Sequence, residues 1–408
     1  MRVSSRTVFE TNVNQLNQQQ GKLLHTQQQL GSGRRMLTPA DDPFASSRAL
    51  EVSQSDAANT QFVTNRNAAK YSTGLAETIL NSVTSLLQDV RTSAVGDGSG
   101  VLTTPDRLAL AEDLKGRLDE LVGLANTTDG IGNYLFSGYQ GRTLPFVKEH
   151  GGIQYVSDDG QRFVQVDSSR QLATSDSGAD IFMRIKNGNG KFSVDALNSN
   201  VGSGVTSQGV VTNPAWLTGH DYKLAFEVNN VDGMPCTTYD VIDLTTSQYL
   251  SKGNQFESGK AINFDGVQMD IKGEPGDCDE FYVTPSENES LFKTMADLIY
   301  TLKSGNPMGG STAAAQYTNG VNRALNNIDR GLQNISTIRT NLGSRLRELD
   351  SLQVTGEDLG LQYKTKLSEL QDVDFNKAVS DLNLQQSSLT AAQKSFKQVS
   401  DLSLFNYL

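Results

Sequence analysis

Few side chains of the kinds that carry metal or imidazole chemistry occur in this sequence. There are three His, two Cys and one Trp among 408 residues. The histidines stand apart, without an H-E-x-x-H or C-x-x-C pattern, so no zinc site is expected. Neither a phosphate-binding G-x-x-x-x-G-K-[ST] loop nor a G-x-S-x-G nucleophile elbow is present. We therefore expect no catalytic residue, no metal and no cofactor, and we do not predict an enzyme.

Long apolar runs and an excess of positive charge are also missing. No window approaches the roughly 18 consecutive apolar residues of a membrane helix, and the mean hydropathy is −0.40. The net charge of −11 opposes binding to nucleic acid or to an anionic membrane. The first residues lack the apolar segment of a Sec signal, so we expect the chain to stay in the cytosol or to leave by another export route.

Charge and hydrophobic period separate the middle of the chain from its flanks. Residues 141–288 hold 11 Lys+Arg and 20 Asp+Glu, a net charge of −9. The same region consists of short alternating runs between turn residues, which predicts antiparallel strands. The expected strands are 153–156, 162–166, 181–186, 222–228, 262–271 and 280–284, with turns at Asn187-Gly188 and Asp265-Gly266.

The flanks have a helical period. Apolar spacings of three and four predict a helix over 69–90 and, after a glycine-rich turn at 96–100, a second helix with Thr104 as N-cap and Pro105 in its first position. The capping-box pattern at 286–289 predicts the start of a returning helix.

The two termini carry the most regular helical repeats. The N-terminal seam consists of Val13, Leu16, Gln20, Leu23, Gln27 and Leu30, and the C-terminal seam of Phe375, Ala378, Leu382, Gln385, Leu389, Ala392, Phe396 and Val399. Glutamine in such a seam lowers stability but restricts register and partner choice. A solitary helix of this kind is marginal in water, so each seam needs the other terminus or further copies of the chain. The alternative is that both are ordinary core helices of a bundle. We expect termini that become ordered on assembly.

These patterns predict an α+β fold, with a long antiparallel helical bundle or coiled coil built from both termini and an inserted antiparallel β-rich outer domain. The predicted division is an N-terminal coiled-coil arm at 1–43, a helical hairpin at 44–140, an acidic β-rich domain at 141–288, returning bundle helices at 289–360 and a C-terminal coiled-coil arm at 361–408.

Several strings resemble the flagellin and hook-associated protein superfamily. They are SGRRM at 32–36, PADDP at 39–43, LANT at 124–127 and YLFSG at 134–138, with LSEL at 367–370, VDF at 373–375 and SLFNYL at 403–408 near the C-terminus. The YLFSG string with Pro145-Phe146 after it, and the closing SLFNYL, resemble one branch, the hook-associated protein 3 or hook–filament junction proteins. The resemblance covers about 1–145 and 288–408 and leaves the middle unmatched.

This resemblance implies a structural adaptor that forms a ring between hook and filament and connects hook-associated protein 1 to flagellin. It further implies export of the unfolded chain by the flagellar type III system, a cytosolic chaperone on the C-terminal helix before export, and a final extracellular location at the junction. The terminal helices are then expected to form the inner tube, the other helices the next layer, and the β domain the exterior.

Two sets of residues are candidates for these roles. The expected assembly interface comprises Val13, Leu16, Leu23, Leu30, Phe375, Leu382, Leu389, Phe396, Val399, Leu404, Phe405 and Leu408. The expected fold motifs, which start a helix or flank an apolar plug with turns, comprise Asp41, Asp42, Pro43, Asn126, Tyr134, Leu135, Phe136 and Gly138.

Two other functions stay open. One is a flagellin, the filament subunit itself, although the closing residues argue against it. The other is an enzymatic or glycan-binding module within 141–288, for which Trp216 alone is insufficient.

The acidic cluster Glu274, Asp277, Asp279 and Glu280 is expected to be a solvated turn rather than a cation site. Cys236 and Cys278 are expected to be unpaired, with a single bridge left open.

Overall fold

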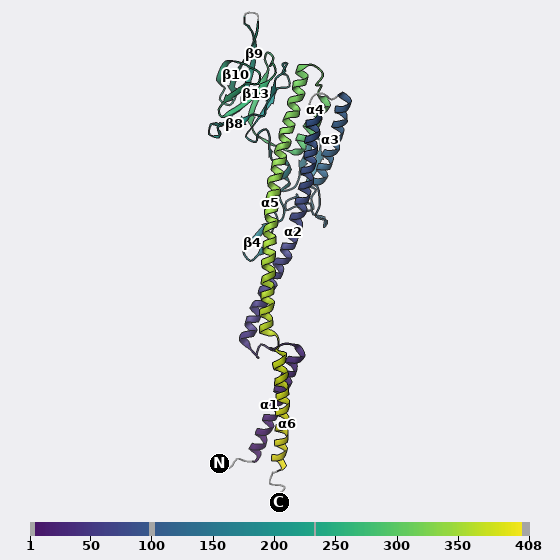
Figure 1. Cartoon of the computed structure of the whole chain (residues 1–408), viewed down its shortest axis with the longest axis vertical. Helices are drawn as coiled ribbons and strands as arrows, with labels where there is room; N and C mark the ends of the chain where they lie inside the picture. The colour runs from purple at the N-terminus through teal and green to yellow at the C-terminus, as the bar shows by residue number, and fades with distance from the viewer. Residues whose placement is uncertain (1–4, 98–102, 232–233, 402–408) are drawn as a thin grey trace. The chain divides into compact units, whose positions relative to one another are not determined.

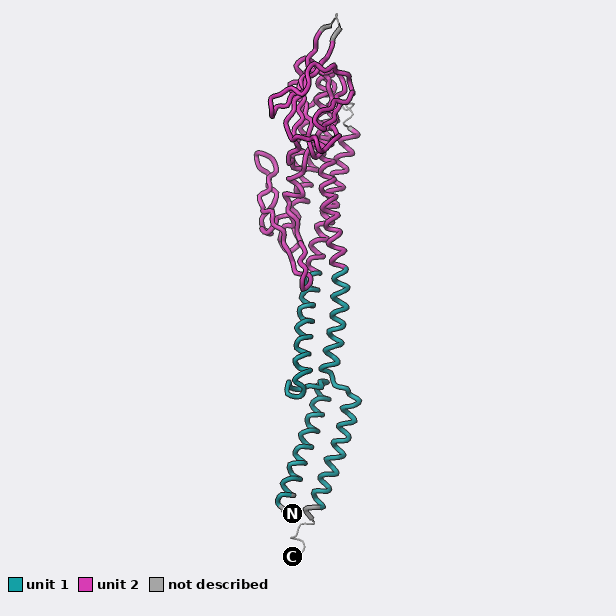
Figure 2. The backbone as a smooth tube through the Cα atoms, turned by 90° about the vertical axis from the view of Figure 1, so that its left-hand side faces the viewer, with its two compact units in different colours: residues 1–66, 351–408 teal, residues 67–350 magenta. Residues whose placement is uncertain are grey.

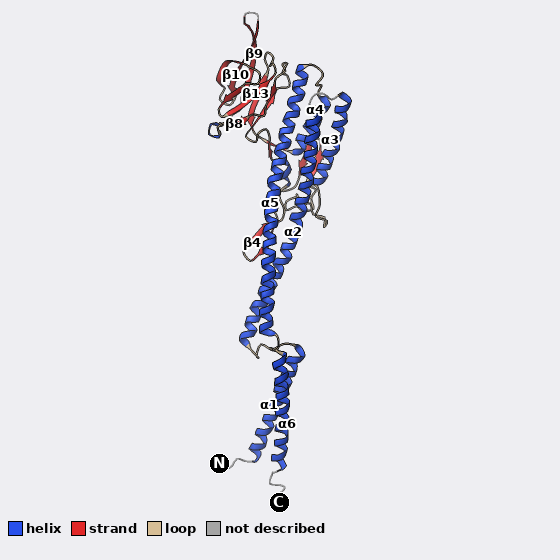
Figure 3. Ribbon diagram, in the orientation of Figure 1, coloured by secondary structure: helices blue, strands red, loops and turns tan. Residues whose placement is uncertain are grey.

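The computed structural model describes residues 5–97, 103–231 and 234–401. It forms two compact units, residues 1–66 with 351–408 and residues 67–350 (Figure 2). Long helices and antiparallel strands both occur, with the strands confined to the middle of the chain (Figure 3), so the α+β prediction is confirmed. Helices α2 (Pro43–Asp97) and α5 (Ser311–Gln371) contribute residues to both units.

The first unit contains the helices of both termini. Helix α1 (Ser5–Ser32) runs antiparallel beside α6 (Phe375–Asp401), as Figure 1 shows. At one end the rings of Phe9 and Phe396 lie 5.2 Å apart, and at the other Arg34 pairs with Asp372 in an isolated β-bridge. The partner of each terminal seam is therefore the other terminus of the same chain.

The second unit is built around a helical core. Helices α2, α3 (Thr104–Ala125), α4 (Leu291–Ser304) and α5 contribute to one apolar cluster. Positions expected on the seam of 69–90 are buried in it, since Val83 and Val90 are fully inaccessible to solvent. On each of α2 and α3 the buried residues recur every three or four positions, so the packing of both helices follows the predicted helical period.

Two predicted helix starts are displaced from their observed positions. The N-cap of α3 is Thr103, not Thr104, because its side chain accepts the Asp106 N–H. Helix α4 begins after Ser290, whose Oγ accepts the Lys293 N–H at 3.0 Å. The predicted cap, Ser286, instead donates its hydroxyl to the Asn187 carbonyl at 2.7 Å. The Ser-x-x-Glu pattern occurs at 286–289, but its last two residues form strand β15, which pairs with an earlier strand, and the helix begins only after it.

Strands fill most of the chain between α3 and α4. They are β1 (Phe146–Glu149), β2 (Gly152–Tyr155), β3 (Phe163–Asp167), β4 (Arg170–Ala173), β5 (Ile185–Lys186), β6 (Phe192–Ala196), β7 (Val205–Thr206), β8 (Val210–Val211), β9 (Tyr222–Val231), β10 (Met234–Asp243), β11 (Gln248–Gln255), β12 (Ala261–Phe264), β13 (Val267–Lys272), β14 (Glu280–Pro285) and β15 (Asn288–Glu289). The main sheet has the order β11-β10-β9-β14-β6, and β12-β13-β7 with β8 form a second sheet. All pairings are antiparallel.

The predicted run at 262–271 is a hairpin. Its turn is Asp265-Gly266, with φ of 39° and 78°, the left-handed geometry that a two-residue hairpin turn requires. The strand predicted at 181–186 is wrong over most of its length. Residues 179–183 form a short π-helical turn, in which the adjacent Ile181 and Phe182 are both fully buried. A strand would have pointed them to opposite faces.

The insertion predicted as one domain at 141–288 belongs to two cores. Its first part contributes Phe146, Ile153, Phe182 and other residues to the helical core. The two sheets enclose a separate core that includes Leu224, Met269 and Phe281. The boundary predicted at 360 lies inside the continuous helix α5, which extends to Gln371.

Candidate assembly interface

The terminal seams pack against each other but remain accessible. Leu16, Leu23 and Leu30 on α1 and Leu382, Leu389 and Phe396 on α6 are all half-buried. Two antiparallel helices cover only the stripe between them, so a seam with no second layer keeps part of its apolar surface in water. The α1–α6 pair therefore has the burial expected of an element that is completed by further helices.

The N-terminal seam differs from the predicted one at two positions. Gln20 and Gln27 are exposed, whereas Gln19 is half-buried and Thr26 is buried. The observed seam continues from Leu16 through Gln19, Leu23, Thr26 and Leu30, with alternating steps of three and four. The prediction selected the wrong glutamine of a consecutive run, because the sequence 18–20 offers the same side chain at each position.

Some expected interface residues lie off the seam or outside the described residues. Phe375 is 56% exposed at the start of α6, and Val13 is half-buried. The side chain of Val399 and all of Leu404, Phe405 and Leu408 lie outside what the structure describes. Sequence reasoning missed the large apolar side chains that face outward from this pair: Leu24 and Leu384 are 57% and 67% exposed, and Val379 is exposed as well.

The loop between α1 and α2 is held by the acidic motif residues. Asp41 accepts the backbone N–H groups of Leu37 and Thr38, each at 2.8 Å, and its other oxygen lies 3.3 Å from His25 Nε2. The Thr38 and Leu37 hydrogen bonds, more than the contact with His25, lower the pKa of Asp41. Asp42 accepts the Ala45 N–H at 3.0 Å and so caps α2, whose first residue is Pro43.

Asn126 ends α3 and holds the edge strand β1. Its Nδ2 donates to the Phe146 carbonyl at 2.9 Å, and its Oδ1 accepts the Phe146 N–H at 3.0 Å. The Phe146 ring is buried against Phe182 and Phe292, at centroid distances of 5.3 and 5.2 Å. The side-chain amide thus takes the place of a neighbouring strand.

The apolar plug at Tyr134–Gly138 is fixed by a tight turn against a second loop. Leu135 and Phe136 are buried, while Tyr134 is half-buried. Gly138 has φ of 63°, and a Cβ there would lie 2.2 Å from the Asp158 carbonyl oxygen. The Asp158 carboxylate accepts the Tyr139 N–H at 2.8 Å, which is the main cause of its lowered pKa. These motif residues serve packing and backbone geometry.

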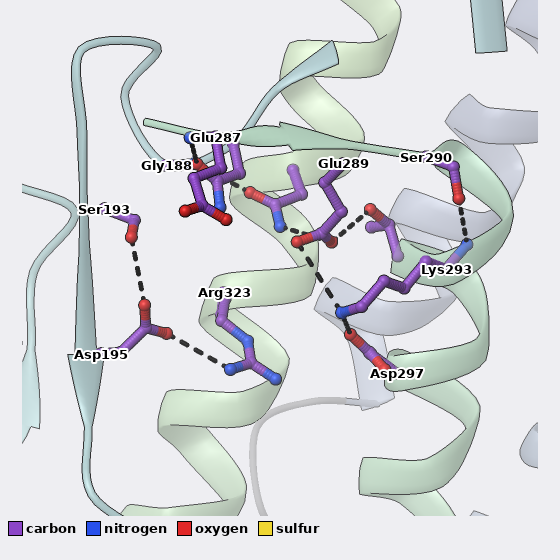
Figure 4. A network of polar contacts seen from close by, with 12 residues as sticks. Gly188, Ser193, Asp195, Glu287, Glu289, Ser290, Lys293, Asp297 and Arg323 are labelled. Carbon is purple, nitrogen blue, oxygen red and sulfur yellow. Dashed lines mark hydrogen bonds and ion pairs between the residues drawn. The ribbon is translucent and has the colours of Figure 1, made fainter. Parts of the chain in front are cut away.

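A polar network joins the β insertion to α4 and α5 (Figure 4). Glu289 on β15 accepts hydrogen bonds from Thr294 Oγ1 at 2.8 Å and Asn327 Nδ2 at 2.9 Å. Asn327 Oδ1 also accepts the Gly188 N–H at 3.0 Å, and Arg323 lies 3.3 Å from Asp195 on β6. Lys293 pairs with Asp297 at 2.7 Å, and Arg323 on α5 pairs with Asp195 on β6, so the network anchors the insertion to the helices.

The acidic cluster is a solvated turn only in part, because Glu274 and Asp277 are exposed whereas Asp279 is buried. Asp279 is only 1% exposed, and its carboxylate accepts the N–H groups of Val201 and Gly276, each at 2.7 Å. Glu280 pairs with Lys223 at 3.0 Å. Within the described residues, no group of three or more His, Cys, Asp or Glu could hold a metal ion.

The two cysteines are free. Cys236 on β10 lies opposite Asn229 of β9, and Cys278 donates its N–H to Phe226 of β9 from the side of β14. Strand β9 thus lies between them. Two strand spacings total about 9 Å, more than the roughly 7 Å that a disulfide spans between Cα atoms.

The nearest approach to catalytic geometry in the β insertion is His220 with Asp243, whose Nδ1 and Oδ2 lie 2.7 Å apart. Burial favours the neutral form of Asp243, but hydrogen bonds from His220 and the Thr246 N–H outweigh it and lower its pKa to about 2. The carboxylate accepts the backbone N–H groups of Thr245 and Thr246 in the turn that follows β10, so it serves that turn.

Trp216 is exposed on a short 3-10 helix. None of the helices among the described residues combines the length and the apolar character needed to cross a membrane.

Comparison with known proteins identifies flagellar proteins as the relatives of this chain. The sequence model of the bacterial flagellin N-terminal helical region matches residues 3–141. Flagellar hook-associated protein 3 of Escherichia coli (strain K12) is 29% identical over 409 residues, which span 99% of each chain.

Two solved structures agree in fold. Flagellar hook associated protein-3 from Legionella pneumophila is 30% identical, with a TM-score of 0.74 over 78% of this chain and 98% of that one. FlgL from Xanthomonas campestris is 29% identical, with a TM-score of 0.71 over 78% of this chain and 99% of that one. The chain therefore belongs to the flagellar hook-associated protein 3 family, structural proteins of the bacterial flagellum within the flagellin superfamily rather than enzymes.

Proposed function

We propose that this chain is a structural adaptor at the hook–filament junction, where a ring of copies connects hook-associated protein 1 to the flagellin filament. The observation that carries the proposal is the α1–α6 pair, whose seam is half-buried and whose outer surface displays Leu24, Val379 and Leu384. Such a pair gains stability from a second layer of helices, which neighbouring copies supply. A similar protein of Legionella pneumophila is described as a flagellar junction protein.

The same pair supports the proposed export route. Helices that are only half-buried on their own seam contribute little to a stable monomer, which suits a chain that crosses the flagellar type III channel unfolded. Before export, the exposed apolar face of α6 is a suitable site for a cytosolic chaperone that binds an amphipathic helix. The protein is then transiently cytoplasmic and finally extracellular.

Immunogold electron microscopy of purified flagella tests the location. An antibody against the two-sheet part of the insertion, residues 192–285, is expected to label a short collar where hook meets filament. Label along the whole filament would identify a flagellin instead. Label absent from both would contradict a structural role at the junction and favour a separate activity of the insertion.

Substitution of the seam tests the interface. We expect Leu389→Asp to abolish junction assembly and chaperone capture, because it places a charge in the half-buried seam. Ser388→Asp, at the adjacent exposed position, is the matched control and should leave both intact. Motility that survives Leu389→Asp would refute the assignment of this seam.

A further inference from the structure

One edge of the main sheet is open. Strand β6 (Phe192–Ala196) is the last strand of the order β11-β10-β9-β14-β6, so β14 covers it on one side only. On its other side, no strand among the described residues pairs with β6. An edge strand of this kind presents backbone N–H and C=O groups to which a further strand can bond.

The register of β6 against β14 decides which backbone groups reach that edge. Just beyond the two ends of β6, Leu197 donates its N–H to the Glu280 carbonyl at 3.1 Å, and the Lys191 carbonyl accepts the Ser286 N–H at 3.0 Å. In an antiparallel pair, positions that are hydrogen-bonded to the partner strand alternate with positions that are not. Because 191 and 197 are hydrogen-bonded, the odd-numbered residues between them bond to β14 and the even-numbered residues point their backbone groups away from it.

Val194 and Ala196 are therefore the residues whose backbone faces the open edge. The third even-numbered residue, Phe192, already has partners, since its N–H is donated to Asn189 Oδ1 at 2.9 Å and its carbonyl accepts the Asn189 N–H at 3.0 Å. For Val194 and Ala196, the described part of the chain supplies no hydrogen-bond partner on this side. Two donors and two acceptors, two residues apart, thus remain along the edge, which is the pattern to which an added strand pairs.

A groove lies beside the same residues. It has a volume of about 460 Å³, which is within the range of ligand-binding pockets, and it is lined by 194–198 on one side. Helices α4 and α5 contribute mainly small side chains to the opposite side. They are Thr301, Ser304, Gly305, Ala313 and Gly320. The open edge therefore borders on space rather than on packed side chains.

The charges around the groove restrict what can enter it. Among the described residues that line it, only Asp195 and Arg323 are charged, and they pair with each other at 3.3 Å (Figure 4). The exposed side chains of Asn198, Tyr300 and Asn306 add polar groups to the lining. The surrounding insertion, residues 141–288, has a net charge of −9 and repels an acidic segment. The groove therefore favours an uncharged or basic segment with small and polar side chains.

We propose that β6 is a docking edge for an extended peptide of a partner protein, which adds as a strand beside Val194 and Ala196 and carries small or polar side chains without Asp or Glu. Main-chain hydrogen bonds give the affinity of such a contact, and the walls of the groove select the side chains. The docking edge involves residues of the second unit only and is independent of the junction role proposed for the α1–α6 pair.

Peptide selection on the purified full chain tests the docking edge. A phage-displayed library of random heptapeptides is panned on the immobilised chain, and the selected peptides are labelled and titrated by fluorescence polarisation. Ala196→Pro removes an N–H from the open edge without removing a bond to β14, and edge strands tolerate proline. Ala196→Ser keeps this N–H and is the matched control. We expect Ala196→Pro to weaken binding about tenfold, as the loss of one hydrogen bond does, and Ala196→Ser to leave it unchanged.

Hydrogen exchange of the unmodified chain tests the geometry without any variant. The amides of Ser193 and Asp195 are expected to exchange slowly because they bond to β14, and those of Val194 and Ala196 to exchange rapidly. A saturating amount of a selected peptide should slow the exchange of Val194 and Ala196. Exchange at these two amides as slow as at Ser193 and Asp195 in the free chain would show a closed edge and overturn the proposal, even where Ala196→Pro fails to fold.

The other results of the selection are equally decisive. A library that yields no binder, or peptides that bind Ala196→Pro as tightly as the parent chain, would overturn the docking edge. Selected peptides rich in Asp or Glu would contradict the stated chemistry of the partner. Self-association of the chain that Ala196→Pro abolishes would identify a second copy, and not a peptide of another protein, as the occupant.

Discussion

Replacing Asn126 by alanine removes both hydrogen-bond partners of one buried backbone unit. The N–H and C=O of Phe146 face away from β2, because Pro145 and Val156 form the neighbouring hydrogen-bonded position of the hairpin. Both groups are met by the Asn126 side chain, at 3.0 and 2.9 Å. Each buried backbone group left unpaired costs about 1–3 kcal/mol. Asn126→Ala is thus expected to lower the free energy of unfolding by about 2 to 6 kcal/mol.

Urea unfolding followed by circular dichroism measures this loss. Asn126→Asp retains the acceptor for the Phe146 N–H but places a second acceptor oxygen against the Phe146 carbonyl, so it should also lower the free energy of unfolding. Asn198→Ala, at an exposed position of the same unit, is the control and should stay within about 0.5 kcal/mol of the parent. An Asn126→Ala chain as stable as this control, with the same dependence on urea, would refute the reasoning.

Three further predictions concern the turns and the seam. Gly138→Ala should lower the free energy of unfolding by about 1–3 kcal/mol in a urea titration, because φ is positive and the new Cβ meets the opposite backbone. Gly132→Ala, with positive φ and open space, should lose less. Equal losses for the two variants would show that the clash does not contribute. Gln385→Leu should raise the midpoint of thermal unfolding of the isolated chain, since it removes a buried unpaired acceptor, and a lower midpoint would contradict this. Because the pKa of Asp41 is lowered in the native state, its carboxylate stabilises the native loop above the unfolded pKa, and this stabilisation is lost as the pH falls below about 4. Asp41→Asn should flatten that part of a pH titration of the free energy of unfolding, and an unchanged profile would refute the role of the carboxylate.

The sequence by itself determined the local features of this protein. The helical period over 69–90, the cap at Asp42-Pro43 and the Asp265-Gly266 hairpin are decided by residues within a few positions of one another, so they can be read from a single stretch. The strings around 134–138 and at the termini were sufficient for the family. Strands β10 and β11 were missed because their residues have no strong alternation. Strand β10 is held by pairing with β9 on one side and β11 on the other, and β11 is held by pairing with β10.

The tertiary structure decided which of several equivalent residues is used. Glutamines at 18, 19 and 20 are indistinguishable in sequence, and only the packing of α1 against α6 puts Gln19 in the seam and leaves Gln20 exposed. In the same way, Ser286 has the pattern of a helix cap, but its hydroxyl donates to the Asn187 carbonyl and residues 288–289 pair with β5, so Ser290 is the cap. Burial, pairing across long separations and the outward position of Leu24 depend on residues hundreds of positions away, which is why no local pattern contains them.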